Sequence, residues 1–316
     1  MPTPRGETSE LLQQVRDATV ASKQNLWQKN NLNPNLIVAQ NGPAAVQALV
    51  SGSVDVAANA PENFLPLVSK GEALQLFDGQ NRQVFQLVAS SSFNPGSATY
   101  PQVVAKLKGK KVGITAPGSA SYYVTKYLLQ QAGLSATDVQ YIDYSSVGGA
   151  VAAIETQRID AGLINEPSTY IVQHDHKGQI LVDLRNVGDG PALISGIAQV
   201  GLWARKSWIA KNPEVVAGIR KTMAEADVFI HDPQNFEAAK AIIGAELPKG
   251  YSEAEISEYV NDNLSNIDSS FPLGALDAWI KFDQQMGALA KPLSAKDLMA
   301  PGTPGTAAEV QHLASS

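Results

Sequence analysis

The chain has 316 residues, enough for one large or two medium-sized domains, with 44% hydrophobic and 17% charged residues, an ordinary globular balance. A net charge of −6 with mixed signs along the chain argues against a nucleic-acid partner, which requires a basic face. The absence of cysteine excludes disulfides, thiolate nucleophiles, cysteine zinc sites and iron–sulfur clusters.

The N-terminal part of the chain predicts a long helix followed by a strand–helix–strand unit. Apolar residues recur at helical spacing from Leu11 to Leu26, and Pro34 ends the pattern. A short helix and a further strand follow the unit. These predicted elements cover residues 8–30, 35–39, 43–51, 54–58, 62–69 and 84–90.

The strand–helix–strand unit occurs twice. The segment 48–56 is similar to the segment 153–161, which lies 105 positions later. Each copy follows an apolar run and leads into a short polar patch that ends in proline, Asn59-Ala60-Pro61 and Asn165-Glu166-Pro167. Two copies predict an α/β protein with two similar Rossmann-like lobes, and small ligands bind in the cleft between such lobes.

Two turn-rich stretches mark where the chain is expected to cross between the lobes. The first stretch is 91–101 and the second is 190–199. The prediction therefore divides the chain into lobe one, residues 1–92 plus 200–316, and lobe two, residues 93–199.

The remaining pattern predicts a loop and helix in lobe two, the second unit, and a helical C-terminal part. The tail from Pro301 is rich in Gly, Pro, Thr and Ala and is expected to be loose. The predicted strands, units and helices here cover residues 111–115, 122–131, 139–164, 180–184, 194–204, 212–231, 233–245, 252–265 and 272–289.

Candidate binding residues lie in the loops at the carboxyl ends of the parallel strands, where such sheets bind ligands. Several loops lead into helices, whose unpaired first amides can hold a carboxylate, sulfonate or phosphate without lysine. The most informative loop is Gly118-Ser119-Ala120-Ser121, where glycine permits close approach and serines add donors, although a serine there also suits an ordinary helix N-cap. The residues expected to bind the ligand are Arg5, Asn41, Gly42, Asn59, Ala60, Glu62, Gly118, Ser119, Ala120, Ser121, Ser145, Ser146, Asn165, Glu166 and Ser195.

Three of these assignments have a structural alternative. Glu166 could receive a ligand ammonium or ring N–H, or it could be a solvated residue at a helix start. Asn59 is equally typical of a strand-end turn, and Arg5 of a surface loop. We expect Glu166 and Asn59 to face each other across the cleft, because each ends the last strand of its unit. His174 and His176 favour a solvated loop over a metal site, so no metal and no cofactor is predicted.

The last sequence feature is a set of four stretches that occur in order, at 25–32, 42–55, 107–119 and 159–167. Together they resemble the solute-binding proteins of ABC importers, in the aliphatic sulfonate, nitrate and thiamine-precursor group with the type II periplasmic binding protein fold. The resemblance implies a monomer that closes on a small anionic or polar organic solute, such as a sulfonate or carboxylate. It also implies hinge bending at the two crossings and delivery of the solute to a membrane permease.

The resemblance implies a periplasmic or membrane-anchored extracytoplasmic location. The first residues of the sequence lack the apolar core of a secretory leader, so the sequence alone leaves two alternatives, a cytosolic protein or a leader that was removed. No stretch is apolar and long enough to span a membrane. One departure from the family is expected, because Met1 lies already in the loop that would follow an apolar first strand.

An enzyme on the same two-lobed frame, of the pyrimidine or quinone-precursor biosynthetic kind, is the alternative function. Such an enzyme requires a catalytic histidine or cysteine in the cleft. Cysteine is absent, and none of the four histidines falls in a predicted pocket loop. A transcription-factor effector domain is a further alternative, but no helix-turn-helix segment precedes the lobes. The sequence therefore favours a binding protein without catalysis.

Overall fold

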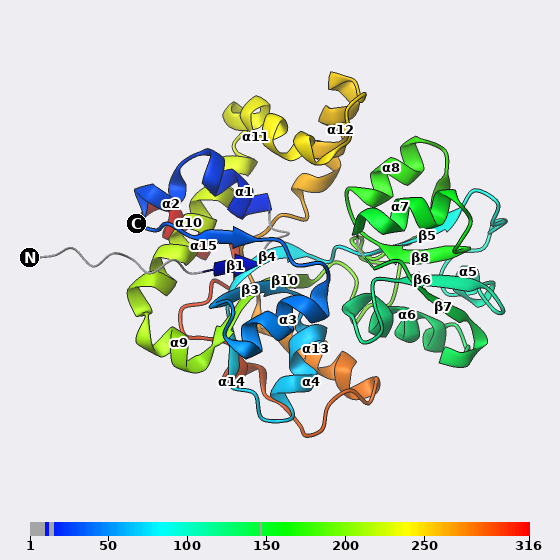
Figure 1. The fold of residues 1–316 in the computed structure, drawn as a ribbon, viewed down its shortest axis with the longest axis horizontal. Coiled ribbons are helices and arrows are strands. Elements are labelled where there is room, and N and C mark those ends of the chain that lie inside the picture. Colours follow the sequence, from blue (N-terminus) through cyan, green and yellow to red (C-terminus); the bar gives the residue numbers. More distant parts are fainter. Residues whose placement is uncertain (1–9, 13–15, 146) are drawn as a thin grey trace, which may run out of the picture.

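The computed structural model describes residues 10–12, 16–145 and 147–316. The strands are β1 Glu10–Leu12, β2 Asn35–Ile37, β3 Val56–Asn59, β4 Leu74–Arg82, β5 Gln86–Ser90, β6 Lys111–Ile114, β7 Gln140–Asp143, β8 Ala161–Ile164, β9 Gly178–Asp183 and β10 Ala198–Arg205. They form two five-stranded sheets, with the order β2-β1-β3-β10-β4 in lobe one and β7-β6-β8-β5-β9 in lobe two. Figure 1 shows the two lobes side by side. The predicted fold class, an α/β protein with two Rossmann-like lobes, is confirmed.

Helices cover both faces of each sheet (Figure 1). No helix among the described residues is long and apolar enough to cross a bilayer. The helices are α1 Arg16–Lys23, α2 Leu26–Lys29, α3 Gly42–Ser51, α4 Pro61–Val68, α5 Gln102–Ala105, α6 Ala120–Gln131, α7 Val147–Glu155, α8 Ser168–His174, α9 Lys206–Lys211, α10 Pro213–His231, α11 Phe236–Ile243, α12 Glu253–Leu264, α13 Leu273–Gln285, α14 Ala295–Leu298 and α15 Ala307–Ser315.

The two sheets share one plan, in which the strand that arrives from the other lobe is inserted antiparallel. In lobe one, β2, β1 and β3 are parallel, and β10 pairs antiparallel with both β3 and β4. In lobe two, β7, β6 and β8 are parallel, and β5 pairs antiparallel with both β8 and β9. Each lobe is therefore completed by a strand that enters directly from a crossing.

The first crossing lies earlier in the chain than 91–101, so that prediction is wrong. Strand β4 ends at Arg82 in the first sheet, and β5 begins at Gln86 in the second. Only residues 83–85 connect them, and the second crossing occupies 184–197. The sequence missed β4 because this strand is buried on both faces although it carries polar residues such as Asp78 and Gln80, which disguise the apolar pattern of a strand.

The N-terminal prediction is also wrong. Residues 10–12 form β1, which lies between β2 and β3 and is parallel to both. The predicted helix 8–30 is therefore replaced by this strand, α1 and α2. The chain contains the first strand whose absence was expected, so the departure from the family does not exist. A strand of three residues is too short to show a period of two in the sequence.

Successive residues of the central strands in lobe one face opposite sides of the sheet, as the pleat requires. Leu76 and Trp203 belong to the apolar cluster that includes side chains of α3, α4 and α13. Phe77 and Leu202 belong to the cluster that includes side chains of α1, α10 and α12. Phe64 of α4 stacks on Trp203, with ring centroids 4.7 Å apart. The sheet of lobe one is therefore buried between two helical layers.

The C-terminal tail is ordered, contrary to the prediction that it is loose. Thr306 caps α15 by accepting a hydrogen bond from Glu309 N at 3.3 Å. Val310 of α15 is buried against α10. The prolines and glycines from Pro301 onward form turns that lead into this helix, so their composition reflects turns and not disorder.

One buried carboxylate makes the stability of the fold depend on pH. Glu62, at the start of α4, is fully buried, and its Oε1 accepts a hydrogen bond of 2.8 Å from Gln199 Nε2. Burial raises the pKa of Glu62 from 4.5 to about 7. Because the folded protein holds this proton more tightly than the unfolded chain, the contribution of Glu62 to stability is full below pH 4.5 and is lost as the pH rises through about 7.

We expect Glu62→Gln to remove this pH dependence. Relative to the wild type, the variant should gain roughly 3 kcal/mol in free energy of unfolding as the pH rises from 4.5 to about 7. Urea unfolding at a series of pH values measures the difference. Glu253→Gln, which neutralises an exposed carboxylate of α12, is the control. A difference between Glu62→Gln and wild type that does not change with pH would contradict the argument.

Candidate functional site

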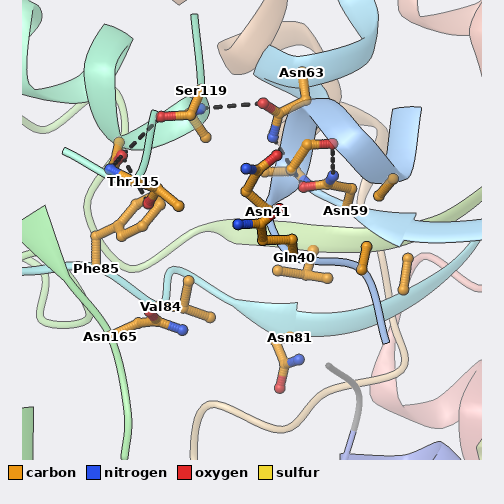
Figure 2. Close-up of a pocket in the computed structure, with 18 residues that line it drawn as sticks. Gln40, Asn41, Asn59, Asn63, Asn81, Val84, Phe85, Thr115, Ser119 and Asn165 are labelled. Atoms are coloured by element: carbon orange, nitrogen blue, oxygen red, sulfur yellow. Dashed lines mark hydrogen bonds between the residues drawn. The ribbon is translucent and has the colours of Figure 1, made fainter. Parts of the chain in front are cut away.

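A cavity of about 150 Å³ lies between the two lobes, at the N-termini of α3, α4 and α6 (Figure 2). The crossing residues Val84 and Phe85 also line it. Among the described residues, its lining includes no charged side chain. We term it the amide chamber, because amide side chains dominate its polar lining. The polar lining residues are Gln40, Asn41, Asn59, Asn63, Asn81, Thr115, Ser119, Ser121 and Asn165.

Two long helices, α3 and α6, begin at the amide chamber, and their N-cap residues line it. Asn41 caps α3, and its Oδ1 accepts a hydrogen bond of 3.0 Å from Ala44 N. Ser119 caps α6, and its Oγ accepts a hydrogen bond of 3.3 Å from Tyr122 N. Both helices therefore direct the positive end of their dipoles toward the chamber, one from each lobe.

Asn63 connects the two lobes across the chamber. Its Oδ1 accepts a hydrogen bond of 3.1 Å from Ala120 N in lobe two, and its Nδ2 donates to Asn59 Oδ1 in lobe one at 2.9 Å. Figure 2 shows Asn63 between the Ser119 loop and Asn59. A Cβ atom at Gly42 would lie 2.8 Å from Asn63 Nδ2, so the glycine makes room for this side chain.

The serine loop of lobe two is held by its own hydroxyls. Ser121 Oγ accepts a hydrogen bond of 2.9 Å from Thr115 N and lies 2.8 Å from Ser119 Oγ. Thr115 Oγ1 lies 3.1 Å from Tyr144 Oη, which donates to Leu163 O at 2.7 Å. Both serines therefore line the chamber and also shape the turn before α6, so the ligand and N-cap interpretations are compatible.

A second cavity of about 380 Å³ adjoins the first and shares Asn81, Val84 and Asn165 with it. We term it the charged chamber, because arginine and glutamate side chains of both lobes line it. The charged residues of its lining are Arg16 and Glu246 of lobe one and Glu166 and Arg185 of lobe two.

The charged side chains of this chamber are paired within each lobe. Arg16 Nη2 lies 2.9 Å from Glu246 Oε2 and donates to Tyr259 Oη at 2.6 Å. Arg185 donates to Asp183 Oδ2 at 2.7 Å and to Glu166 Oε1 at 3.3 Å. Burial raises the pKa of the Glu166 carboxyl, although Tyr170 N–H and Arg185 oppose the shift.

The structure brings most of the predicted site residues to these two chambers. Glu166 lines the charged chamber. Arg5 and Ser146 lie outside the described residues. The predicted residues that line the amide chamber are Asn41, Gly42, Asn59, Ala60, Ser119, Ala120, Ser121 and Asn165.

Four predicted residues do not line either chamber. Glu62 is buried behind the wall and bonds Gln199. Gly118 adopts a left-handed φ of 78° in the turn before Ser119, so its role is to make that turn. Ser145 is exposed after β7. Ser195 is buried in the second crossing, before β10, although the predicted strand 194–204 included it.

Glu166 and Asn59 do not face each other in one cavity, so that expectation is wrong. Asn59 lines the amide chamber and Glu166 lines the charged chamber. The reason is local, because Glu166 Oε2 turns back to accept a hydrogen bond of 2.9 Å from Tyr170 N in α8. Asn165, one residue earlier, lines both chambers.

Sequence reasoning missed residues whose position depends on pairing between distant segments. Asn63 lies inside a predicted helix, and Asn81 lies in β4, which was not predicted. Arg16 was assigned to the middle of a long helix, whereas it is the first residue of α1. Arg185 follows the predicted strand 180–184. This position at a strand end was the only feature of the sequence that could have identified it as a site residue.

The lobes also touch beside the charged chamber, through α8 of lobe two and α12 of lobe one. His174 Nε2 lies 2.7 Å from Glu255 Oε1, and Tyr170 Oη donates to Glu255 O at 2.9 Å. The rings of His174 and Tyr251 lie 4.9 Å apart. We term these four residues the clasp. In the described part of the chain, no group of three potential metal ligands includes His174.

Known proteins share this architecture. Residues 12–244 match the NMT1-like family. A relative from Brucella abortus (strain 2308), provisionally named a binding protein, is 28% identical over 295 residues, which cover 88% of this chain and 84% of the relative.

Two solved structures have the same fold. A structure from Bordetella bronchiseptica RB50 has a TM-score of 0.77 and 25% identity, and the match covers 98% of this chain and 97% of that one. The alkanesulfonate-binding protein SsuA from Xanthomonas axonopodis pv. citri, bound to MOPS, has a TM-score of 0.73 and 17% identity over 95% and 99% of the two chains. The resemblance to the sulfonate and nitrate group of periplasmic binding proteins is thereby confirmed, and the chain belongs to the NMT1-like family.

Proposed function

We propose that this protein is the extracytoplasmic solute-binding component of an ABC importer. It captures a small anionic or polar organic solute in the amide chamber and delivers it to a membrane permease. The observation that carries the proposal is the amide chamber itself, an uncharged polar cavity to which both lobes contribute a helix N-terminus. A cleft between lobes is the usual place for a small ligand.

The chemistry of the amide chamber favours an acceptor group on the solute. Helix N-termini and side-chain N–H groups stabilise negative charge without a basic side chain. The volume of about 150 Å³ is below the roughly 300–1,000 Å³ of drug-sized pockets, so the chamber suits a small head group. An alkanesulfonate is the ligand named for one structure of the same fold, which supports sulfonates and carboxylates as the first compounds to test.

Binding without catalysis is the part of the proposal that the lining residues support. None of the described residues that line the two chambers is a histidine, and the sequence contains no cysteine. The common nucleophile–base pairs of acyl- and group-transfer enzymes require one or the other. We propose that the protein acts as a monomer and hands over the solute by opening the cleft.

Ligand binding tests the proposal directly. Ethanesulfonate, propionate and nitrate are the first probes, and a probe at about 100 times its dissociation constant should raise the free energy of unfolding by about 2.7 kcal/mol. Asn63→Ala removes the amide that spans the chamber, so it should weaken the best probe by about 1–3 kcal/mol in a calorimetric titration. Asn261→Ala, on the exposed face of α12, is the control. The proposal is wrong if no probe stabilises the wild type, or if Asn63→Ala binds as the wild type does.

We expect the clasp to make closure depend on pH. Hydrogen bonds with Asp175 and Glu255 raise the pKa of His174 above 6.5. The charged ring holds Glu255 most strongly below pH 6.5, and closure should weaken as the pH rises through the raised pKa of His174.

The absence of native cysteine permits a direct measurement of the distance between the lobes. Dyes attached at Gln173→Cys in lobe two and Asn261→Cys in lobe one should report a larger mean separation at pH 9 than at pH 6. At pH 6, adding His174→Gln should increase the separation by about the same amount. His312→Gln, far along the chain in α15, is the control. A separation that is independent of pH in the wild type would exclude this role of the clasp.

A further inference from the structure

The two lobes also meet where α6 of lobe two lies against α4 and α13 of lobe one, and we term this the α6 contact. The rings of Tyr127 in α6 and Phe282 in α13 meet edge-on, with their centroids 5.1 Å apart. One apolar cluster includes these two side chains and Phe64 of α4. Figure 1 shows α6 and α13 below the crossings, whereas the clasp helices α8 and α12 lie above them. Because the α6 contact joins helices of different lobes, opening of the cleft would separate them.

Two acids of lobe one, Glu62 in α4 and Asp283 in α13, are fully buried in the helices that α6 contacts. Gln199 Nε2 donates to Glu62 Oε1 at 2.8 Å. Among the described residues, Glu62 Oε2 and both carboxyl oxygens of Asp283 have no hydrogen-bond partner. An ionised carboxylate is costly to bury without donors, so this environment favours the neutral, protonated form of both acids.

The charged side chains around these two acids do not neutralise them. The lysines of α13 and α14 are exposed, and Arg205 pairs with Asp55 at 2.8 Å. Lys126 Nζ lies over the ring of Tyr123, 5.9 Å from its centroid. In the described part of the chain, no cation donates a hydrogen bond to either acid. Helix α3 carries no titratable group, and those of the other packed elements are Tyr122, Tyr123, Lys126 and Tyr127 of α6, Asp277 and Lys281 of α13, Lys296 and Asp297 of α14, and Arg205 of β10.

The two acids affect each other and the facing lobe. Burial raises the pKa of Glu62 to about 7. Burial also raises the pKa of Asp283, and the negative charge of Glu62 raises it further. In lobe two, burial raises the pKa of Tyr123, and the charge of Asp283 adds to this shift. The charge of Asp283 therefore acts across the α6 contact, and the two acids are harder to ionise together than singly.

We propose that Glu62 and Asp283 form a buried proton-binding pair, and that closure of the cleft on a solute takes up protons at this pair. Opening moves α6 away from α4 and α13, so water reaches the acids and solvates their ionised forms. Closure removes that water and restores the neutral forms. Because the closed state holds these protons more tightly, the affinity for the solute is highest below the ordinary pKa of a carboxyl and falls as the pH rises through the raised values. This inference rests on the proposed function.

The number of protons taken up on binding tests this inference. Ethanesulfonate and nitrate are the probes, because both stay fully ionised near neutral pH and any proton taken up enters the protein. Calorimetric titrations at pH 7 in bis-Tris, imidazole and Tris, whose ionisation enthalpies differ, give the proton number from the dependence of the heat on the buffer. All measurements use a His174→Gln background, which removes the titratable ring of the clasp. We expect uptake of roughly half a proton or more per bound probe, and an affinity that falls about threefold or more from pH 6 to pH 8.

Neutral replacements of the pair should abolish the uptake. Glu62→Gln combined with Asp283→Asn keeps both side chains uncharged at every pH, so almost no proton should be taken up and the affinity should not change with pH. Asp277→Asn, which neutralises an exposed carboxylate of the same α13, is the control and should keep the uptake. Unfolding curves check the fold of each variant. If the double variant does not fold, Asp283→Asn alone should still take up fewer protons than Asp277→Asn.

The outcomes separate the inference from the proposed function. Binding of a probe without proton uptake would overturn the proton-binding pair and leave the binding function in place. Uptake in the Glu62 and Asp283 variants that equals the uptake in Asp277→Asn would do the same. If neither probe binds, both the inference and the proposed function are overturned.

Discussion

Two buried glutamines hold the crossings together, and the rest of the cleft depends on them. Gln83, in the first crossing, donates from its backbone N to Ile197 O at 2.7 Å and from its side chain to Ile194 O at 3.0 Å. Gln199, just after the second crossing, accepts a hydrogen bond of 3.2 Å from Val84 N. Both side chains are fully buried, where an unpaired amide would be costly. The two crossings are thus one paired unit, which fixes where Val84 and Phe85 stand between the lobes.

The amide side chains of the cleft satisfy one another before any solute enters. Asn59 donates to Gly42 O at 2.9 Å and accepts from both Ala60 N and Asn63 Nδ2. Such a network stays in place only while its members remain paired, so it favours one geometry of the chamber. An apolar solute would offer these groups no hydrogen-bond partner. The chamber therefore favours solutes that form hydrogen bonds over apolar solutes.

The parts of the fold that follow from local pattern were predictable, and the parts set by distant pairing were not. The repeated unit predicted β3 and β8, and the polar residues after them led to Asn59 and Asn165. Local capping chemistry likewise led to Asn41 and Ser119. By contrast, β4 carries buried polar side chains, so its sequence does not show the apolar pattern of a buried strand.

The limits at the site have the same physical origin. The role of Asn63 depends on a hydrogen bond to Ala120, which is distant in sequence and lies in the other lobe. Asn165 lines the amide chamber and Glu166 does not, because Glu166 Oε2 accepts a hydrogen bond from Tyr170 N in α8.

The topology has a further consequence, for the order of folding. Strands β4 and β10 are antiparallel neighbours, with Arg82 opposite Ala198, although all of lobe two lies between them in the chain. Closing a loop of that length costs about 4 kcal/mol of chain entropy. Lobe two is continuous in sequence and its first and last strands, β5 and β9, are paired, so its own folding brings Arg82 and Ala198 together. This topology therefore favours folding of the inserted lobe before the strands β4 and β10 of the surrounding sheet pair.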